Sequence, residues 1–558
     1  EVSGEGSNVT VDTGVTVSAS SVALESSGSE TINAITNNGT ISVSGQAALQ
    51  NSSAITTLTN SGQISASSHY GLKNASGGII GTLNNLGTIS STNNHNGLYN
   101  FNSAVINVLN NSGTISASKN KGLLNNTNAL IVELNNSGTI SSGQEYGLRN
   151  DNGASITTLT NSGNIQSNRN GLYNTSTITT IINESSGNIK ALNGDYGLKN
   201  PGGTIGTLNN LGTISSTSEY GVFNSNSGVI TTLLNSGTIS SNRAGLWNES
   251  TITTLTNTGN IKALNGNFGL KNVQGANIGI LSNSGEISAT GDYGIVNDNS
   301  TIGTLVNTGT ISGGNSIGIY NDGGTITTLN NLQGASSSAL TYKGALSTNY
   351  NAIVNSTSDY GKIVFSDKSG TTTFGVDITS TLTGSSVNTT YSDVISGLTE
   401  DDLESCTSDI DCITGNKFEG TNKYNWKLDD TNGDDDWDLI ITSIASSIPT
   451  APELPGTPTL ESMNSLKSVT DANFAHMNTY DCDFFGNNND SCLSLGARRS
   501  EVTSPSSTTD GIVLVAGKKY SDYLRFGGFY HTNTNHNTSK NLKLSDKTPL
   551  LGSLIVWN

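Results

Sequence analysis

Residues 230–248 read ITTLLNSGTISSNRAGLWN, and this stretch decides the fold. Its pattern is I-x-x-L-x-N-x-G-x-I-S, then a variable stretch, then G-L-x-N. The first isoleucine of successive copies is at positions 32, 55, 80, 106, 131, 156, 178, 205, 230, 252, 278, 302 and 326. A period of about 20–50 residues is typical of solenoids and other stacked repeats.

Each copy contains short apolar segments separated by turn residues. In one copy Ile55, Leu58, Ile64 and Leu72 stand among threonine and serine, with glycine and asparagine between the segments. No copy has ten residues of helical periodicity, and the core pattern of leucine-rich repeats is absent. Three strands and three turns per copy are the layout of a parallel β-helix. We therefore expect an all-β, right-handed parallel β-helix over residues 32–335.

Energetics require the copies to stack. One coil offers about four inward apolar side chains, each worth roughly 1.5–3 kcal/mol when buried. Ordering some 25 residues costs about 1–2 kcal/mol per residue in backbone entropy. A single coil is therefore unstable, whereas stacked coils share ladder hydrogen bonds and a continuous core. Thirteen coils at about 4.8 Å each predict a rod of roughly 60 Å.

The asparagine that closes G-L-x-N, or a close variant, returns in almost every copy. Stacked in register, these amides can bond to one another along the axis. Asparagine also tolerates the left-handed backbone region at corners. We expect a structural asparagine ladder of Asn74, Asn100, Asn125, Asn150, Asn174, Asn200, Asn224, Asn248, Asn272, Asn297 and Asn321.

The variable position of G-L-x-N forms a second column. Because the leucine points inward, the next residue points outward. The column contains Lys73, Tyr99, Leu124, Arg149, Tyr173, Lys199, Phe223, Trp247, Lys271, Val296 and Tyr320, and no acid. It is interpreted either as an ordinary solvated face or as a strip that binds glycans or a partner solenoid. For the second interpretation the candidate stripe is the column without Leu124 and Val296.

Charge and cysteine content restrict the possible partners and the compartment. Net charge is −18, from 43 acidic and 25 basic residues, so nucleic acid is not an expected partner. The four cysteines form two close pairs, and three connectivities are possible. We expect local disulfides, Cys406–Cys412 and Cys482–Cys492, formed in an oxidising compartment. No metal ligand spacing accompanies them.

Both ends of a solenoid expose strand edges and need caps. Residues 8–19 alternate in polarity, and residues 1–31 are expected to form an N-terminal β cap. Residues 336–442 are expected to form a C-terminal cap that ends in YNWKL and WDLIIT. Between these last two segments, Asp430, Asn432, Asp434 and Asp436 alternate. They are interpreted either as an acidic hairpin turn or as calcium ligands, although the glutamate that completes an EF-hand loop is missing.

The remaining segments differ in character. Residues 443–477 hold a proline-rich linker, 445–458, and an apolar pattern near helical spacing, 459–477. Residues 478–558 contain long alternating segments of the kind found in outer-membrane β-barrels. Since a closed barrel needs about eight strands or more, we expect this region to be the truncated start of one.

This order of segments resembles that of a bacterial autotransporter, a type V secretion protein. The resemblance covers essentially the whole chain, and the Gly/Asn/Ser-rich repeats are most similar to adhesin and self-aggregating passengers of that family. It implies a passenger carried to the cell surface through its own barrel, which anchors it in the outer membrane, with 459–477 as the helix that threads the pore.

The sequence offers no catalytic constellation, cofactor fingerprint or recurring acidic stripe. His69 and His95, the two histidines of the repeats, lie in variable stretches and are expected to be structural or incidental. We expect no enzyme activity and no cofactor. The expected function is adhesion to a host-cell protein or glycan, or self-association. The alternative is a passenger similar to vacuolating cytotoxins.

Overall fold

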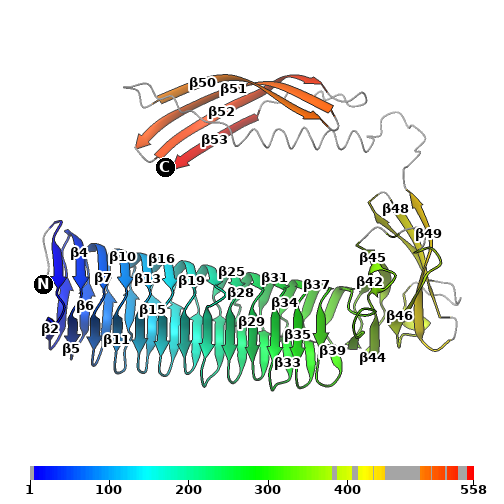
Figure 1. Ribbon diagram of the computed structural model, residues 1–558, viewed down its shortest axis with the longest axis horizontal. Coiled ribbons are helices and arrows are strands. Elements are labelled where there is room, and N and C mark those ends of the chain that lie inside the picture. Colours follow the sequence, from blue (N-terminus) through cyan, green and yellow to red (C-terminus); the bar gives the residue numbers. More distant parts are fainter. Residues whose placement is uncertain are drawn as a thin grey trace. The chain divides into compact units, whose positions relative to one another are not determined.

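The computed structural model describes residues 5–379, 382, 386–404, 413–420, 422–430, 433–446, 491–503, 506–521, 524–537 and 550–557. The chain divides into two units, Glu1–Ser447 and Ile448–Asn558. The first unit is a parallel β-solenoid of about 15 turns with almost no helix, which confirms the all-β solenoid part of the predicted fold (Figure 1). The right-handed sense of the coil stays a prediction.

From β1 to β39, each coil contributes one strand to each of three sheets. The first strand of a repeat, I-x-x-L-x-N, lies in sheet 1. This 17-stranded sheet contains β1 (Asn8–Val11), β4 (Thr31–Asn37), β7 (Ala54–Asn60), β10 (Ile79–Asn85), β13 (Val105–Asn111), β16 (Leu130–Asn136), β19 (Ser155–Asn161), β22 (Thr177–Asn183), β25 (Thr204–Asn210), β28 (Val229–Asn235), β31 (Thr251–Asn257), β34 (Asn277–Asn283), β37 (Thr301–Asn307), β40 (Thr325–Asn331), β42 (Asn349–Ser356), β43 (Asp359–Tyr360) and β45 (Thr373–Ile378).

The short I-S segments form sheet 2, which has 13 strands. These are β2 (Thr16–Ala19), β5 (Thr40–Val43), β8 (Gln63–Ala66), β11 (Thr88–Ser91), β14 (Thr114–Ala117), β17 (Thr139–Ser142), β20 (Asn164–Ser167), β23 (Asn188–Ala191), β26 (Thr213–Ser216), β29 (Thr238–Ser241), β32 (Asn260–Ala263), β35 (Glu286–Ala289) and β38 (Thr310–Ser312).

The G-L-x-N segments form sheet 3, which continues into the C-terminal part of the unit. Its parallel strands are β3 (Val22–Ser26), β6 (Ala47–Asn51), β9 (Tyr70–Asn74), β12 (Leu98–Phe101), β15 (Lys121–Asn126), β18 (Tyr146–Asp151), β21 (Asn170–Asn174), β24 (Tyr196–Pro201), β27 (Tyr220–Ser225), β30 (Ala244–Asn248), β33 (Phe268–Val273), β36 (Tyr293–Asp298), β39 (Ile317–Asp322), β41 (Leu340–Ala345), β44 (Ile363–Ser369) and β46 (Thr390–Ser396).

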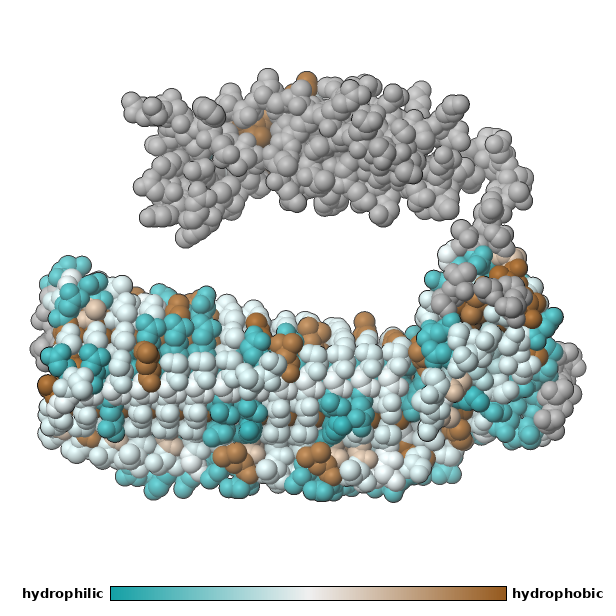
Figure 2. Space-filling model, in the orientation of Figure 1, coloured by the Kyte–Doolittle hydropathy of each residue, from teal (hydrophilic) through white to brown (hydrophobic). Residues whose placement is uncertain are grey.

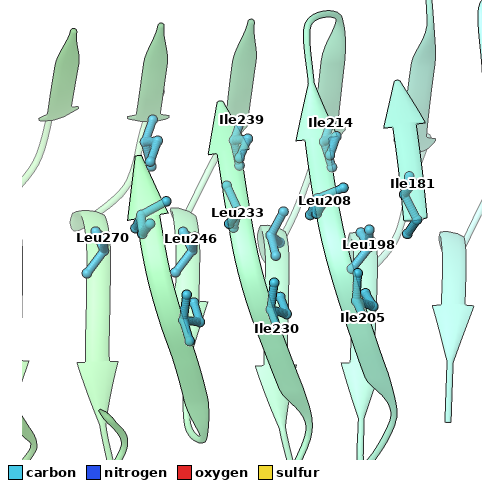
Figure 3. Close-up of a cluster of buried hydrophobic side chains, with 14 of the residues drawn as sticks. Ile181, Leu198, Ile205, Leu208, Ile214, Ile230, Leu233, Ile239, Leu246 and Leu270 are labelled. Atoms are coloured by element: carbon cyan, nitrogen blue, oxygen red, sulfur yellow. The ribbon is translucent and has the colours of Figure 1, made fainter. Parts of the chain in front are cut away.

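Isoleucine and leucine from all three sheets fill the axis of the solenoid. Ile205 and Leu208 of β25, Ile214 of β26 and Leu198 of β24 are fully buried. Figure 3 shows the same arrangement repeated from coil to coil. Equivalent residues pair in register, for example Ile205 with Ile230. Each buried side chain contributes about 1.5–3 kcal/mol, so the core grows with every added coil.

The corner between sheets 1 and 2 has no space for a side chain. At Gly237 a Cβ atom would lie 2.1 Å from the carbonyl oxygen of Gly212 in the neighbouring coil. Non-bonded heavy atoms need about 3.5 Å, so a larger residue would push the coils apart. The glycine of N-x-G is therefore a requirement of stacking.

The solenoid has more turns than the thirteen counted from the repeat. At the N-terminal end β1, β2 and β3 pair in parallel with β4, β5 and β6. At the other end β42 pairs in parallel with β40, and β45 with β42. In these segments valine or aromatic residues, such as Val11 and Tyr350, fill the core in place of the isoleucine and leucine of the I-x-x-L motif. The repeat motif alone therefore missed them.

The end of the first unit changes from parallel to antiparallel pairing. Strand β46 pairs with β49 (Asp436–Ser446), β49 with β48 (Asn422–Asp429), and β48 with β47 (Thr414–Glu419), all antiparallel. A 3-10 turn, η2 (Glu400–Asp402), lies between β46 and β47 in the chain. Large side chains fill this part, and the indole N–H of Trp437, which is fully buried, donates to the carbonyl oxygen of Leu398 at 2.7 Å.

The second unit contains a four-stranded antiparallel sheet of β50 (Ser491–Thr503), β51 (Ser506–Ser521), β52 (Leu524–Asn537) and β53 (Leu550–Trp557). Its interpretation as the start of a barrel stays a prediction. The predicted pore helix at 459–477 and most of the proline-rich linker lie outside the described residues. Cys406, Cys412 and Cys482 also lie outside them, so neither predicted disulfide is tested.

Candidate functional site

The outward column of sheet 3 is continuous along the solenoid. Lys73 pairs in register with Tyr99, Arg149 with Tyr173, and Tyr173 with Lys199. Lys199 pairs with Phe223, Phe223 with Trp247, Trp247 with Lys271, Lys271 with Val296, and Val296 with Tyr320. The candidate stripe residues thus belong to one column, completed by Leu124 and Val296, and Lys343 of β41 extends it beyond Tyr320.

A second column beside the stripe was missed by sequence reasoning. It consists of the residue before the glycine of G-L-x-N, and its aromatic members are Tyr70, Tyr146, Tyr196, Tyr220, Phe268 and Tyr293. The recurring Y-G-L or F-G-L triplet was the available signal. These rings contact the stripe directly, because Tyr220 stacks on Trp247 at 4.5 Å and Tyr196 lies 4.9 Å from Phe223.

Cationic side chains lie over the rings. Lys199 Nζ is 4.6 Å from the Tyr196 ring centroid and 5.1 Å from that of Phe223. Lys271 Nζ lies 5.0 Å from the Trp247 centroid, and the Arg243 guanidinium 5.4 Å from it. Such contacts are worth roughly 0.5–2 kcal/mol each, more when desolvated. The two columns together bring rings and cations into contact along the outer face of sheet 3.

Burial decides how much of the stripe can reach a ligand. Tyr220 is 7% exposed, and Phe223 and Trp247 are each 8% exposed. With Ala244 and Val273 they form a hydrophobic cluster separate from the axial core. Their ring faces are covered by each other and by cations, whereas stacking on a sugar needs a free face. The middle of the stripe is therefore packed as a small outer core.

Burial also shifts the pKa values of tyrosine and lysine side chains in the two columns. Burial raises the pKa of Tyr99 to about 12, and the neighbouring Tyr70 adds to this shift. Burial also raises the pKa of Tyr220 and lowers that of Lys199. Both directions favour the neutral form of a group removed from water. These pKa shifts are consistent with side chains that pack against one another and do not recognise a charged ligand.

The two histidines of the repeats meet across neighbouring coils. The rings of His69 and His95 stack with centroids 4.2 Å apart, and Tyr70 lies 5.0 Å from His95. Burial lowers the pKa of His95, with further contributions from His69 and Lys121. Two parallel rings at this separation pack against each other and do not converge on one ligand.

Two asparagine columns run through the interior. In sheet 3, Asn200 Nδ2 donates to Asn224 Oδ1, and Asn224 to Asn248, each at 2.9 Å. This column includes Asn74, Asn100, Asn125, Asn150, Asn174, Asn272, Asn297 and Asn321. Sequence reasoning did not single out the other column, in sheet 1, where Asn210 donates to Asn235 at 2.7 Å. Its signal was the asparagine of I-x-x-L-x-N.

The acidic turn between β48 and β49 is a local hydrogen-bonded structure. The Asp430 carboxylate accepts from the backbone N–H of Gly433 at 2.9 Å and of Asp434 at 3.3 Å. Asn432 lies outside the described residues. Among the residues the structure describes, no three His, Cys, Asp or Glu side chains gather as metal ligands do. Within the same residues, no helix has the length and apolar character needed to cross a bilayer.

Comparison of the chain with protein-family models, curated proteins and solved structures gave no match. A parallel β-solenoid of about 15 turns is typical of autotransporter passengers, and it fits a surface passenger domain in general.

Proposed function

We propose that the solenoid is the surface-exposed passenger of an autotransporter, located at the bacterial cell surface, and that it acts by binding and not by catalysis. Its role is adhesion to a host-cell protein or glycan, or association with a second passenger. The observation that carries this proposal is one structural unit repeated over about 15 turns, whose outward strand positions hold mostly threonine, serine and asparagine. Such a rod offers many equivalent weak contacts, which add up when two surfaces meet.

The distribution of charge supports a binding role. Most charged groups of the solenoid that form ion pairs do so between neighbouring coils, as Lys121 does with Glu145 at 2.7 Å and Lys262 with Glu286 at 2.7 Å. These pairs neutralise charge locally. On the side of the solenoid that Figure 2 shows, most of the surface is pale, which marks intermediate hydropathy, and the hydrophilic residues form separate patches. A contact through neutral polar groups fits this exterior.

Surface display tests the proposal. The full chain, fused to an outer-membrane anchor on a non-adherent bacterium, is expected to cause clumping or attachment to host cells. The matched control carries Ile230→Asp and Ile252→Asp, which bury charge in the axial core and prevent folding. Equal surface levels are checked by antibody labelling.

The possible outcomes separate the candidate functions. Clumping or attachment that the folded chain shows and the control lacks supports the proposal. Display of the folded chain without either activity contradicts it. Permeabilisation of host membranes by the purified chain would favour the cytotoxin-like alternative.

A further inference from the structure

The outer face of sheet 1 carries almost no charge. The strands β19, β22, β25, β28, β31, β34, β37 and β40 contain no Asp, Glu, Lys or Arg. We call the outward side chains of these eight strands the neutral face. Elsewhere charges interrupt the surface, with Lys190 and Lys262 on sheet 2 and Lys199 on sheet 3. On a chain of net charge −18 this neutrality distinguishes one face from the others.

The neutral face is regular as well as uncharged. Thr180, Thr207, Thr232 and Thr254 are register neighbours in one half-buried column. Each hydroxyl can donate and accept a hydrogen bond, so such a column is complementary to itself. Two large apolar side chains interrupt the polar groups near the centre, Leu234 at 37% and Ile280 at 45% exposure.

We propose that the neutral face is the contact through which two copies of this chain associate, which rests on the proposed function and assigns its self-association to one surface. Two molecules of charge −18 repel each other, and the repulsion is smallest where both surfaces are neutral. Glu184 and Glu249 lie at the borders of the face, at the corners that flank β22 and β31. Because these carboxylates repel a second acidic chain, they restrict the contact to the strands between the corners.

The size of the face suits a stable dimer. Eight strands at about 4.8 Å spacing, each about 20 Å long, give roughly 800 Å² per partner. Specific interfaces of standard size bury about 800 Å² per partner. Hydroxyl and amide groups that find partners across the contact avoid the cost of unpaired buried polar atoms.

Symmetry fixes the arrangement. A two-fold axis in the contact plane, perpendicular to the solenoid axis and passing between β28 and β31, makes the two rods antiparallel and pairs all eight strands. It places β28 with Thr232 opposite β31 with Thr254 of the second copy. Antiparallel rods suit passengers that extend toward each other from two facing cells.

A charge-reversal series on the full chain tests this assignment by sedimentation equilibrium. The double variant Thr232→Asp with Thr254→Asp brings like charges together in the contact and is expected to weaken the dimer at least tenfold. The double variant Thr232→Lys with Thr254→Lys is expected to do the same. An equimolar mixture of the two is expected to restore dimers to within about threefold of the parent chain. The control, Thr213→Asp with Thr238→Asp, places the same charges on adjacent coils of sheet 2.

The outcomes distinguish this inference from the proposed function. Dimers that survive the sheet 1 variants, or that weaken equally with the sheet 2 control, overturn the assignment of the face while self-association stands. A parent chain that stays monomeric overturns the inference, and the display assay then decides whether host-cell adhesion stands. Circular dichroism of each variant shows whether the solenoid is intact. If the Asp variant is unfolded, the dimerisation of the Lys variant, compared with that of the parent chain and the sheet 2 control, still decides.

Discussion

Trp247 stacks on Tyr220 with ring centroids 4.5 Å apart and ring planes inclined by 19°, although the two residues belong to neighbouring coils. The Trp247 indole N–H also donates to Glu249 at 3.0 Å. The outer face of sheet 3 therefore has a packed layer of its own. This layer makes the stripe a contributor to stability.

Replacing this tryptophan tests the interpretation of the stripe. Trp247→Ala is expected to lower the free energy of unfolding by about 3 kcal/mol, because a large ring that is 8% exposed loses its contacts. Trp247→Phe keeps a ring and is expected to cost less. Urea unfolding followed by circular dichroism measures both. Unchanged stability in Trp247→Ala would identify the ring as an open ligand platform.

The asparagine column of sheet 3 is expected to contribute to the stability of the solenoid. Asn224 Nδ2 donates to Asn248 Oδ1 at 2.9 Å, to Gly228 O at 3.0 Å and to Thr251 O at 3.1 Å. Asn224→Ala leaves buried polar atoms without partners and is expected to cost about 2–3 kcal/mol. Asn94→Ala, at an exposed asparagine, is the matched control and is expected to change stability by less than about 0.5 kcal/mol. Equal denaturation midpoints for the two variants would argue against the ladder's role.

Close packing around the glycine of G-L-x-N leads to a third prediction. A Cβ atom at Gly221 would lie 2.7 Å from the carbonyl oxygen of Gly245 and 2.9 Å from Ile239 Cγ2. Gly221→Ala is therefore expected to destabilise the solenoid by about 1–3 kcal/mol, since the backbone of the next coil has to shift. Ser218→Ala, at an exposed position in the same coil, serves as control. A thermal unfolding midpoint that falls only in Gly221→Ala is the expected result.

The raised pKa of Tyr99 predicts a response to alkaline pH. In the folded chain the phenol keeps its proton until about pH 12, because burial and Tyr70 oppose ionisation, whereas in the unfolded chain it ionises near pH 10. The unfolded state then binds fewer protons, so stability falls as the pH rises from about 10 to 12. Phenolate absorbance of the parent minus that of Tyr99→Phe is expected to titrate near pH 12. A difference that titrates near pH 10 would contradict the burial of this ring.

The acidic turn predicts independence from calcium. Because Asp430 already accepts backbone hydrogen bonds from Gly433 and Asp434, we expect chelation of calcium to leave the thermal midpoint unchanged. Asp430→Ala is expected to lower stability by about 1 kcal/mol through loss of these bonds. A midpoint that rises with added calcium in the parent chain, and does not rise in Asp430→Ala, would favour the ion-binding alternative.

The sequence by itself determined the stacked β-solenoid. The apolar positions of Ile55, Leu58, Ile64 and Leu72 return in successive copies with turn residues between them, and only stacking buries them all. The period also specified which residues form columns, because each column repeats one position of the motif. The first and last turns were missed because residues such as Val11 and Tyr350 fill the same interior without the motif.

Only the tertiary structure decided what the columns do. Periodicity places Lys199 and Trp247 on the outside of sheet 3, but it does not reveal that Tyr220, from another position of the motif, lies against them and closes the surface. That contact depends on strand register and on side-chain direction, which link residues of different coils. Likewise, the neutrality of one whole face is visible only when eight strands are placed side by side, because burial and repulsion are properties of assembled surfaces.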